Sequence, residues 1–252
     1  MSAGGQPGHW PYPRWIAHRG AGKLAPENTL AAFRLGAERG YRMYECDAKL
    51  SADGVVFLLH DATLDRTTNG SGVAGDQAWA TLSQLDAGGW HSHAFAGEAL
   101  PTLAALARHC QAHGHWLNIE IKPTPGTELA TGRAVAQLAA HEWARDPGRT
   151  PLLTSFQPDA LRGAMETAPH LPRGLLLDTW WDGWMDVARS LECVALVCNH
   201  ALWDASTVAL AQEAGLRTLA YTVNDEWAAQ RLLDLGLDGI ITDRIDLFPP
   251  SR

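Results

Sequence analysis

Short apolar runs alternate with helical patterns along most of this 252-residue chain, and this rhythm constrains the fold more than any other feature. Short runs that are apolar throughout are typical of strands covered on both faces. Repeated strand–helix units predict parallel strands joined by right-handed crossovers. We expect strands over residues 15–18, 42–50, 55–60, 116–121, 152–155, 174–177, 193–198, 217–223 and 239–241.

Helical patterns fill most of the intervals between these runs. The first begins after Asn28 or Thr29, either of which can cap it, and ends at Gly40. The others are expected over residues 102–113, 128–145, 159–167, 205–214 and 226–235. About eight strands with intervening helices predict an α/β fold of the (β/α)8 TIM barrel type. An open doubly wound sheet is the alternative, but no GxGxxG follows the first strand to support it.

One long stretch interrupts the rhythm. The turn pair Asp53-Gly54 predicts a hairpin between the second and third apolar runs. The following residues, 62–100, are rich in Thr, Gly, Asp and Asn and are expected to form a small inserted subdomain. Residues 1–13, rich in Gly and Pro, are expected to be a loose N-terminal tail. Residues 14–252 would then form a single barrel domain.

Charge and composition exclude several classes of protein. The net charge of −8 disfavours a general nucleic-acid binder, which needs a basic face. The chain contains no run of about 18 apolar residues, so no membrane span is predicted. The first residues lack the pattern of a signal peptide, and the spacing of the four cysteines suggests neither a disulfide framework nor a zinc site. A cytoplasmic protein with reduced thiols is therefore expected.

Acidic residues gather where the predicted strands end, which is where barrels of this type carry their functional groups. Glu45 and Asp47 share one face of a strand, with Cys46 on the other. Glu120, at the end of a neighbouring strand, completes a set of three carboxylates. Such oxygen ligands select Mg²⁺ or Ca²⁺, or Mn²⁺, rather than Zn²⁺. The alternative is that these acids are simply paired with Arg or Lys.

Basic residues and histidines lie at the same strand ends. Arg19 can grip a phosphate with two parallel hydrogen bonds, and Lys122 can offset its charge. Each can equally belong to an ordinary salt bridge. His18 and His60 can act as an acid and a base near neutral pH, although a lone histidine at a strand end is more often structural. Asp61 either orients a neighbour or occupies a turn.

Two further candidates were placed at the rim of the site. Trp181 lies in a tryptophan-rich stretch after the sixth predicted run, and Asn224 follows the eighth. The tryptophans can line the mouth of the barrel and pack a substrate, or they can cover its outer helices; the second interpretation is favoured.

Ordered motifs across nearly the whole chain show a resemblance. The chain resembles the glycerophosphodiester phosphodiesterases, and its compact size is similar to their cytosolic bacterial branch. One departure is that Gln157 precedes Pro158, where an Asn is frequent in the family. The matching segments are IAHRG (16–20), APENTLAAF (25–33), ECD (45–47), HD (60–61), LDRTTNG (64–70), PTL (101–103), NIEIK (118–122), YTVN (221–224) and DGIITD (238–243).

The resemblance implies a TIM barrel with an inserted subdomain and a divalent cation held by Glu45, Asp47 and Glu120. It implies an acid/base pair, His18 and His60, with Arg19 and Lys122 near the phosphate. The reaction would convert a small-molecule glycerophosphodiester and water to sn-glycerol 3-phosphate and an alcohol. The division of roles between the histidines, and the choice of water or a substrate hydroxyl as nucleophile, stay open.

Two other functions are compatible with the sequence. A lipid-cleaving enzyme of the lysophospholipase D or sphingomyelinase type is one, and the inserted segment disfavours it. A non-catalytic scaffold is another, and it would have no reason to keep both histidines and all three acids. The oligomeric state is open between a monomer and a homodimer.

Overall fold

Eight parallel strands close into a barrel in the computed structural model, which describes residues 10–248 and 250. Around the ring the order is β1-β9-β8-β7-β6-β5-β4-β2, and a pairing of β1 with β2 completes the closure. The predicted TIM barrel is therefore confirmed. The barrel strands are β1 (Trp15–Ala17), β2 (Met43–Leu50), β4 (Trp116–Ile121), β5 (Leu152–Ser155), β6 (Arg173–Leu177), β7 (Ala195–Asn199), β8 (Arg217–Tyr221) and β9 (Gly239–Thr242).

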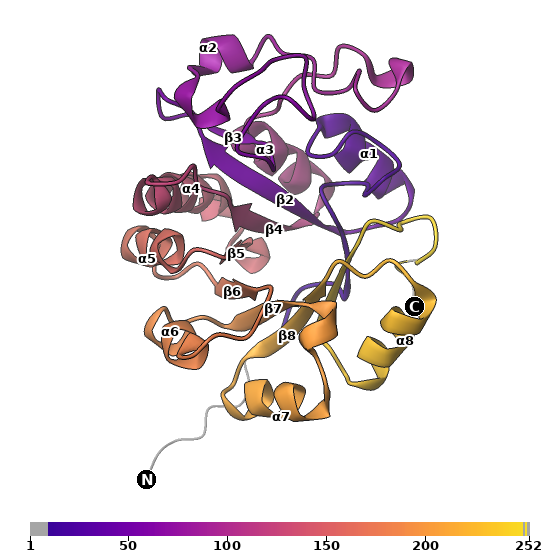
Figure 1. The fold of residues 1–252 in the computed structure, drawn as a ribbon, viewed down its shortest axis with the longest axis vertical. Helices are drawn as coiled ribbons and strands as arrows, with labels where there is room; N and C mark the ends of the chain where they lie inside the picture. The colour runs from indigo at the N-terminus through magenta and orange to yellow at the C-terminus, as the bar shows by residue number, and fades with distance from the viewer. Residues whose placement is uncertain (1–9, 249, 251–252) are drawn as a thin grey trace.

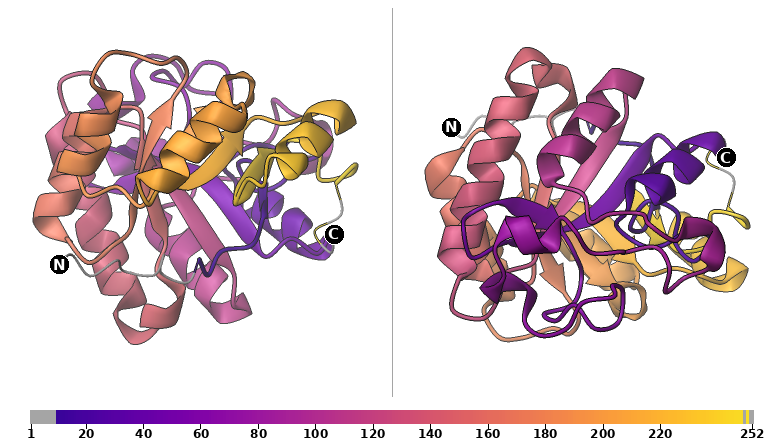
Figure 2. Two further views of the ribbon diagram at one scale, coloured as in Figure 1. Left: turned by 90° about the horizontal axis from the view of Figure 1, so that it is seen from below. Right: turned by 90° about the horizontal axis from the view of Figure 1, so that it is seen from above.

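Helices cover the outside of the barrel, as the three views in Figures 1 and 2 show. Thr29 rather than Asn28 caps the first, since its side chain accepts a hydrogen bond from the Ala32 N–H. All six expected helices are present, and α6 is an additional one within the tryptophan-rich stretch. The helices are α1 (Leu30–Glu38), α3 (Leu103–His113), α4 (Glu128–Glu142), α5 (Pro158–Thr167), α6 (Trp184–Ser190), α7 (Ala205–Glu213) and α8 (Glu226–Asp234).

The strand β2 is longer than its neighbours and belongs to both the barrel and the predicted hairpin. It pairs with β4 in the barrel and with the antiparallel strand β3 (Val56–Leu58) in the predicted hairpin. Tyr44, Cys46 and Ala48 contribute to the apolar layer beneath the helices. Strand alternation directs Glu45 and Asp47 the other way, into the barrel. The expected orientation of these acids is therefore confirmed.

The inserted segment 62–100 forms a lobe beside the hairpin, drawn in purple at the top of Figure 1. It contains the short helix α2 (Trp79–Leu82), two 3-10 helices and isolated bridges, consistent with its turn-rich sequence. Its residues share a small apolar cluster with the hairpin: Phe57, Leu59, Leu64, Ala74, Leu82, Ala87 and Leu100. The lobe is thus anchored to the strand that leads into His60.

The N-terminal end of the barrel interior is closed by residues that we had assigned to a loose tail. Tyr12 is buried, donates a hydrogen bond to the Thr150 carbonyl at 3.0 Å, and packs its ring against Trp116. Trp10 packs edge-on against Tyr12. The expectation for residues 10–13 was wrong because these aromatic side chains bury against the barrel; residues 1–9 lie outside the described part.

Among residues 10–248 and 250, no helix is both long enough and apolar enough to cross a membrane.

Candidate active site

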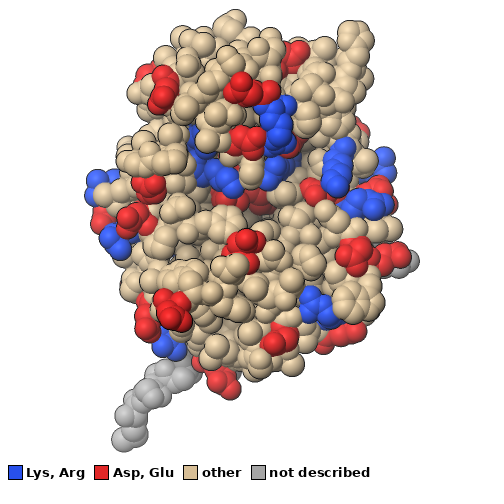
Figure 3. All heavy atoms as spheres, viewed as in Figure 1, with Lys and Arg blue, Asp and Glu red and all other residues tan. Residues whose placement is uncertain are grey.

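A cavity of about 270 Å³ lies at the carboxyl ends of the barrel strands. Figure 3 shows it as a hollow near the middle of one face, with Lys and Arg along the edge nearer the inserted segment and acidic groups inside. Six of the predicted residues line it: His18, Arg19, Glu45, His60, Glu120 and Lys122. The other lining residues are Asn118, Thr154, Phe156, Leu176, Asp178, Tyr221, Thr222 and Ile241.

Three carboxylates lie together at this cavity: Glu45 and Glu120 line it, and Asp47 is fully buried next to them. Asp47 and Glu120 are register partners on β2 and β4, and Glu45 lies two residues before Asp47. One oxygen from each lies within 4.8 Å of the others. Glu45 is 3% exposed and Asp47 0% exposed, so these charges have little access to water. Such a cluster is costly without a compensating cation.

The electrostatics of the three acids differ. Burial, together with the negative charges of Asp47 and Glu120, raises the pKa of Glu45 well above its ordinary value. Burial and the charge of Asp47 also raise the pKa of Glu120. Burial has the same tendency at Asp47, but the positive charges of Arg19 and Lys122 outweigh it and hold the pKa of Asp47 below its ordinary value.

Two buried carboxylate oxygens make no hydrogen bond within the described residues: Oε1 of Glu45 and Oδ1 of Asp47. Buried polar atoms are rarely left without a partner, and here both belong to the acid cluster. Hard oxygen atoms that lack a hydrogen bond and lie at this spacing match the ligands of Mg²⁺, Ca²⁺ or Mn²⁺. The residues present therefore fit a divalent cation.

His18 is fixed from behind by a residue whose role we did not predict. Its Nδ1 lies 2.6 Å from Oδ1 of Asp243, which follows β9, and its Nε2 lies 3.8 Å from Oε2 of Glu45. Asn224 donates to the other Asp243 oxygen at 2.9 Å and accepts from the Asp243 N–H at 3.0 Å. Burial opposes ionisation of Asp243, but the hydrogen bond from His18 lowers its pKa to about 2.

On the other side of the cavity, His60 is also held by a hydrogen bond between its Nδ1 and an aspartate. Its Nδ1 lies 2.6 Å from Oδ1 of Asp61. Arg66, from the inserted segment, donates to both oxygens of Asp61 at 2.6 and 3.0 Å. Arg66 also donates twice to Glu27, at 2.8 Å each. Burial lowers the pKa of His60, and the charge of Asp47 partly offsets that effect.

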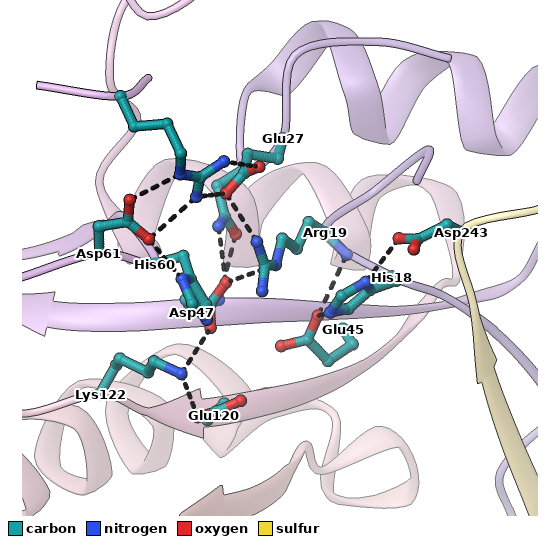
Figure 4. A network of polar contacts seen from close by, with 12 residues as sticks. His18, Arg19, Glu27, Glu45, Asp47, His60, Asp61, Glu120, Lys122 and Asp243 are labelled. Atoms are coloured by element: carbon teal, nitrogen blue, oxygen red, sulfur yellow. Dashed lines mark hydrogen bonds and ion pairs between the residues drawn. The ribbon is translucent and has the colours of Figure 1, made fainter. Parts of the chain in front are cut away.

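Arg19 and Lys122 bracket Asp47, as Figure 4 shows. Arg19 Nε lies 3.1 Å from one Asp47 oxygen, and Arg19 Nη1 donates to Glu27 at 2.8 Å. The Arg19 backbone adopts a φ of +51°, and its N–H donates to Glu45 at 3.1 Å. Lys122 Nζ donates to Glu120 at 2.9 Å and lies 3.9 Å from the other Asp47 oxygen.

The two rim candidates are not among the residues that line the cavity. Trp181 is 39% exposed, while Trp180 packs against Trp184 and Trp203. The indole rings of Trp180 and Trp184 thus serve packing, as the favoured interpretation held. Asn224 contributes indirectly, because it holds Asp243 in place with two hydrogen bonds. Its place in the YTVN segment was the only sequence signal for this role.

Comparisons with known proteins agree with this geometry. The sequence profile described as "Glycerophosphoryl diester phosphodiesterase family" matches residues 18–247. A putative glycerophosphodiester phosphodiesterase of Bacillus subtilis is 34% identical over 241 residues, which are 92% of this chain and 95% of that protein. A glycerophosphodiester phosphodiesterase of Caldanaerobacter subterraneus is 34% identical over 232 residues, 90% of this chain and 93% of that one.

Solved structures show the same similarity. An Oleispira antarctica phosphodiesterase, in complex with the product sn-glycerol-3-phosphate, superposes with a TM-score of 0.87 at 35% identity, covering 95% of this chain and 94% of that one. A glycerophosphodiester phosphodiesterase of Agrobacterium tumefaciens superposes with a TM-score of 0.78 at 28% identity, covering 96% of this chain and all of the other.

Proposed function

This chain belongs to the glycerophosphoryl diester phosphodiesterase family, and from that membership and the site geometry we propose how it hydrolyses glycerophosphodiesters to sn-glycerol 3-phosphate and an alcohol. The observation that carries the proposal is the convergence of three acids, two of them buried, between two histidines. Each histidine has Nδ1 hydrogen-bonded to an aspartate, and both histidines line one cavity with Glu45 and Glu120.

Glu45, Asp47 and Glu120 hold the divalent cation in this proposal. Mg²⁺ and Ca²⁺ suit an all-carboxylate set best, and Mn²⁺ suits it as well. When bound, the cation supplies positive charge to the phosphate oxygens and to the charge that develops in the transition state. The oxygens of Glu45 and Asp47 that make no hydrogen bond support this assignment.

Arg19 and Lys122 bind the phosphate in this proposal. Both line the cavity, and both are held in place by the acids that they neutralise. Because their side chains are anchored before substrate arrives, little side-chain freedom is lost when a phosphate binds. The guanidinium offers a planar fork to two phosphate oxygens, whereas the ammonium acts as a point charge.

His18 and His60 transfer the protons. An ionised carboxylate only accepts hydrogen bonds, so each Nδ1 must carry the proton in its bond to Asp243 or Asp61. Nε2 of each ring is then the atom free to exchange a proton with substrate. One histidine takes a proton from the attacking oxygen, and the other protonates the departing alkoxide as the P–O bond breaks. The geometry supports either assignment.

Two nucleophiles fit this scheme, and they differ in a measurable intermediate. Water attacking phosphorus gives sn-glycerol 3-phosphate directly. The glycerol 2-hydroxyl attacking phosphorus expels the head-group alcohol first and leaves a cyclic phosphate, which water then opens. Phosphorus NMR during turnover distinguishes the two, because only the second route passes through a cyclic ester.

A coupled assay of sn-glycerol 3-phosphate release tests the proposed function. We expect activity on glycerophosphodiesters that EDTA abolishes and that Mg²⁺, Ca²⁺ or Mn²⁺ restores. The matched substrate is a lysophospholipid with the same head group, on which the purified enzyme should be much slower. Activity insensitive to chelator, or a preference for the lysolipid, would contradict the proposal.

We also propose a cytoplasmic location. Its support is that Cys46, Cys110, Cys193 and Cys198 are all buried and free, as is usual in a reducing compartment. Fractionation of the source cells tests this. A homodimer and a monomer are both compatible with the sequence. Sedimentation velocity of the purified protein distinguishes the two oligomeric states.

A further inference from the structure

We propose that Asp178 forms a subsite for a positively charged head group, so that this enzyme prefers glycerophosphodiesters of alkylammonium alcohols over those of neutral alcohols. The inference rests on the proposed function, because it assigns the part of the same cavity that the phosphate chemistry leaves unused. Asp178 lines that cavity, and no step above employs it.

The position of Asp178 is across the mouth from the reacting groups. It directly follows β6, which lies opposite β1 in the ring, and β1 leads into His18 and Arg19. Tyr221 ends β8, which lies opposite β4, the strand of Glu120. A diester whose phosphate sits beside Glu120 and Arg19 can therefore extend one of its two arms toward Asp178.

The charge of the cavity wall changes along this direction. Of the described residues that line the cavity, the only Lys and Arg are Arg19 and Lys122, and both belong to the phosphate side. The edge of the hollow away from the inserted segment shows an acidic group among uncharged atoms in Figure 3. A carboxylate without a basic partner on that wall favours a cationic arm and disfavours an anionic one.

The carboxylate of Asp178 is oriented by its neighbours rather than neutralised by them. Asn199 donates to its Oδ1 at 3.0 Å, and the Tyr221 hydroxyl lies 3.5 Å from the same atom. Both contacts reach one oxygen and come from uncharged groups, so the full negative charge remains available. The Tyr221 hydroxyl also donates to the Leu177 carbonyl at 3.0 Å, which fixes the ring.

Aromatic rings complete the subsite. Phe156 and Tyr221 both line the cavity and meet edge to face, with ring centroids 5.7 Å apart. The ammonium of Lys122 lies 5.7 Å from the Phe156 centroid, which places this ring at the boundary with the phosphate side. A carboxylate beside aromatic rings is the environment that attracts alkylammonium groups, quaternary ones included. A neutral polyol would gain hydrogen bonds there but no charge attraction.

The test compares substrates that share the glycerol phosphodiester and differ in head-group charge. Glycerophosphocholine and glycerophosphoethanolamine carry a cation, and glycerophosphoglycerol does not. For the wild-type enzyme we expect a higher kcat/KM with the two cationic substrates. Asp178 is exposed, so its charge is partly screened by water. Asp178→Asn keeps the shape and should lower kcat/KM for the cationic substrates by about three- to fivefold while changing the neutral one by less than about 1.5-fold.

Asp182→Asn is the matched control. Asp182 is an exposed acid on the same loop that does not line the cavity, so its loss removes the same charge without touching the subsite. We expect unchanged discrimination in that variant. A uniform loss across all three substrates in Asp178→Asn would show that Asp178 recognises the shared glycerol, and unchanged discrimination would remove it from recognition; either result overturns the proposal.

Calorimetric binding to the His60→Ala enzyme repeats the comparison without turnover. Tighter binding of glycerophosphocholine than of glycerophosphoglycerol, lost on adding Asp178→Asn, would support the subsite. Equal binding of the two would overturn the subsite while leaving the phosphodiesterase activity unaffected.

Discussion

Asp243 accepts a hydrogen bond from His18 at 2.6 Å across the seam where the last strand of the barrel meets the first. The aspartate is itself held by two hydrogen bonds with Asn224. His18 is therefore oriented only when the barrel is closed, which ties its chemistry to the completed fold.

Replacing Asp243 with Asn should lower kcat by about 10- to 100-fold with little change in KM, the usual range for a group that orients a functional side chain. The amide can no longer fix the Nδ1–H tautomer or stabilise the imidazolium. The pH profile of kcat is the decisive readout, because the amide carries no negative charge beside the His18 ring. An unchanged profile with a lower melting temperature would indicate a purely structural role.

The histidines themselves should show larger effects. His18→Ala and His60→Ala should each reduce turnover at least about 100-fold, since general acid–base catalysis contributes about 10²–10⁴-fold. Circular dichroism should show an intact barrel, because both side chains lie at strand ends rather than in the core. Near-normal activity in either purified variant would refute its assignment.

Arg66 provides a separate test of how the inserted segment contributes. It donates to both Asp61 and Glu27, and these acids hold His60 and Arg19 respectively. Arg66→Ala should therefore lower kcat by about tenfold or more, as expected when supporting hydrogen bonds are lost.

Arg66→Lys should recover only part of that loss, because a single ammonium cannot reproduce the paired hydrogen bonds of the guanidinium. Arg133→Ala is the control: it breaks an exposed ion pair with Glu166 between α4 and α5 and should leave kcat unchanged. Full activity in Arg66→Ala would mean that Asp61 and Glu27 keep their positions without it.

Much of this site could be predicted because its signals are local in sequence. Strand parity alone places Glu45 and Asp47 on one face, and the rhythm of strands and helices places Glu120 on a neighbouring strand. The contacts that hold the two histidines in place could not be predicted in this way. His18 and Asp243 meet only through barrel closure, and Arg66 lies in an irregular segment whose path no periodicity defines.

The two errors in the predicted fold also concern parts of the chain that have no clear local signal in the sequence. Tyr12 lies in a Pro-rich stretch that resembles a tail, and only the open end of the barrel gives its ring a place to bury. The helix α6 is seven residues long and begins after Gly183 in a left-handed conformation, so it is too short to show a clear period.

The acid cluster makes a prediction about stability that does not depend on turnover. Burial raises the pKa of Glu45 and of Glu120 in the folded protein, so without a cation the unfolded chain releases these protons at lower pH than the folded chain does. Above the ordinary titration range of a glutamate, the unfolded chain therefore binds fewer protons than the folded chain does. Stability of the metal-free protein therefore falls with rising pH in that window.

A bound cation reverses this penalty, because it favours the ionised carboxylates in the folded state only. In EDTA-treated protein, adding Mg²⁺ or Ca²⁺ should raise the melting temperature, and the gain should be larger at about pH 8 than at about pH 5.5. At a concentration 100 times Kd the expected stabilisation is about 2.7 kcal/mol. Differential scanning calorimetry at the two pH values measures it.

Glu45→Gln separates this effect from general salt stabilisation. The amide oxygen can still accept the hydrogen bond from the Arg19 N–H, so the local geometry is kept while one buried charge is removed. The metal-free variant should be more stable than metal-free wild type at about pH 8, because it lacks the repulsion with Asp47 and Glu120. It should also gain much less on addition of the cation. If wild type and Glu45→Gln gained equally, the cation would bind elsewhere and these carboxylates would not be its ligands.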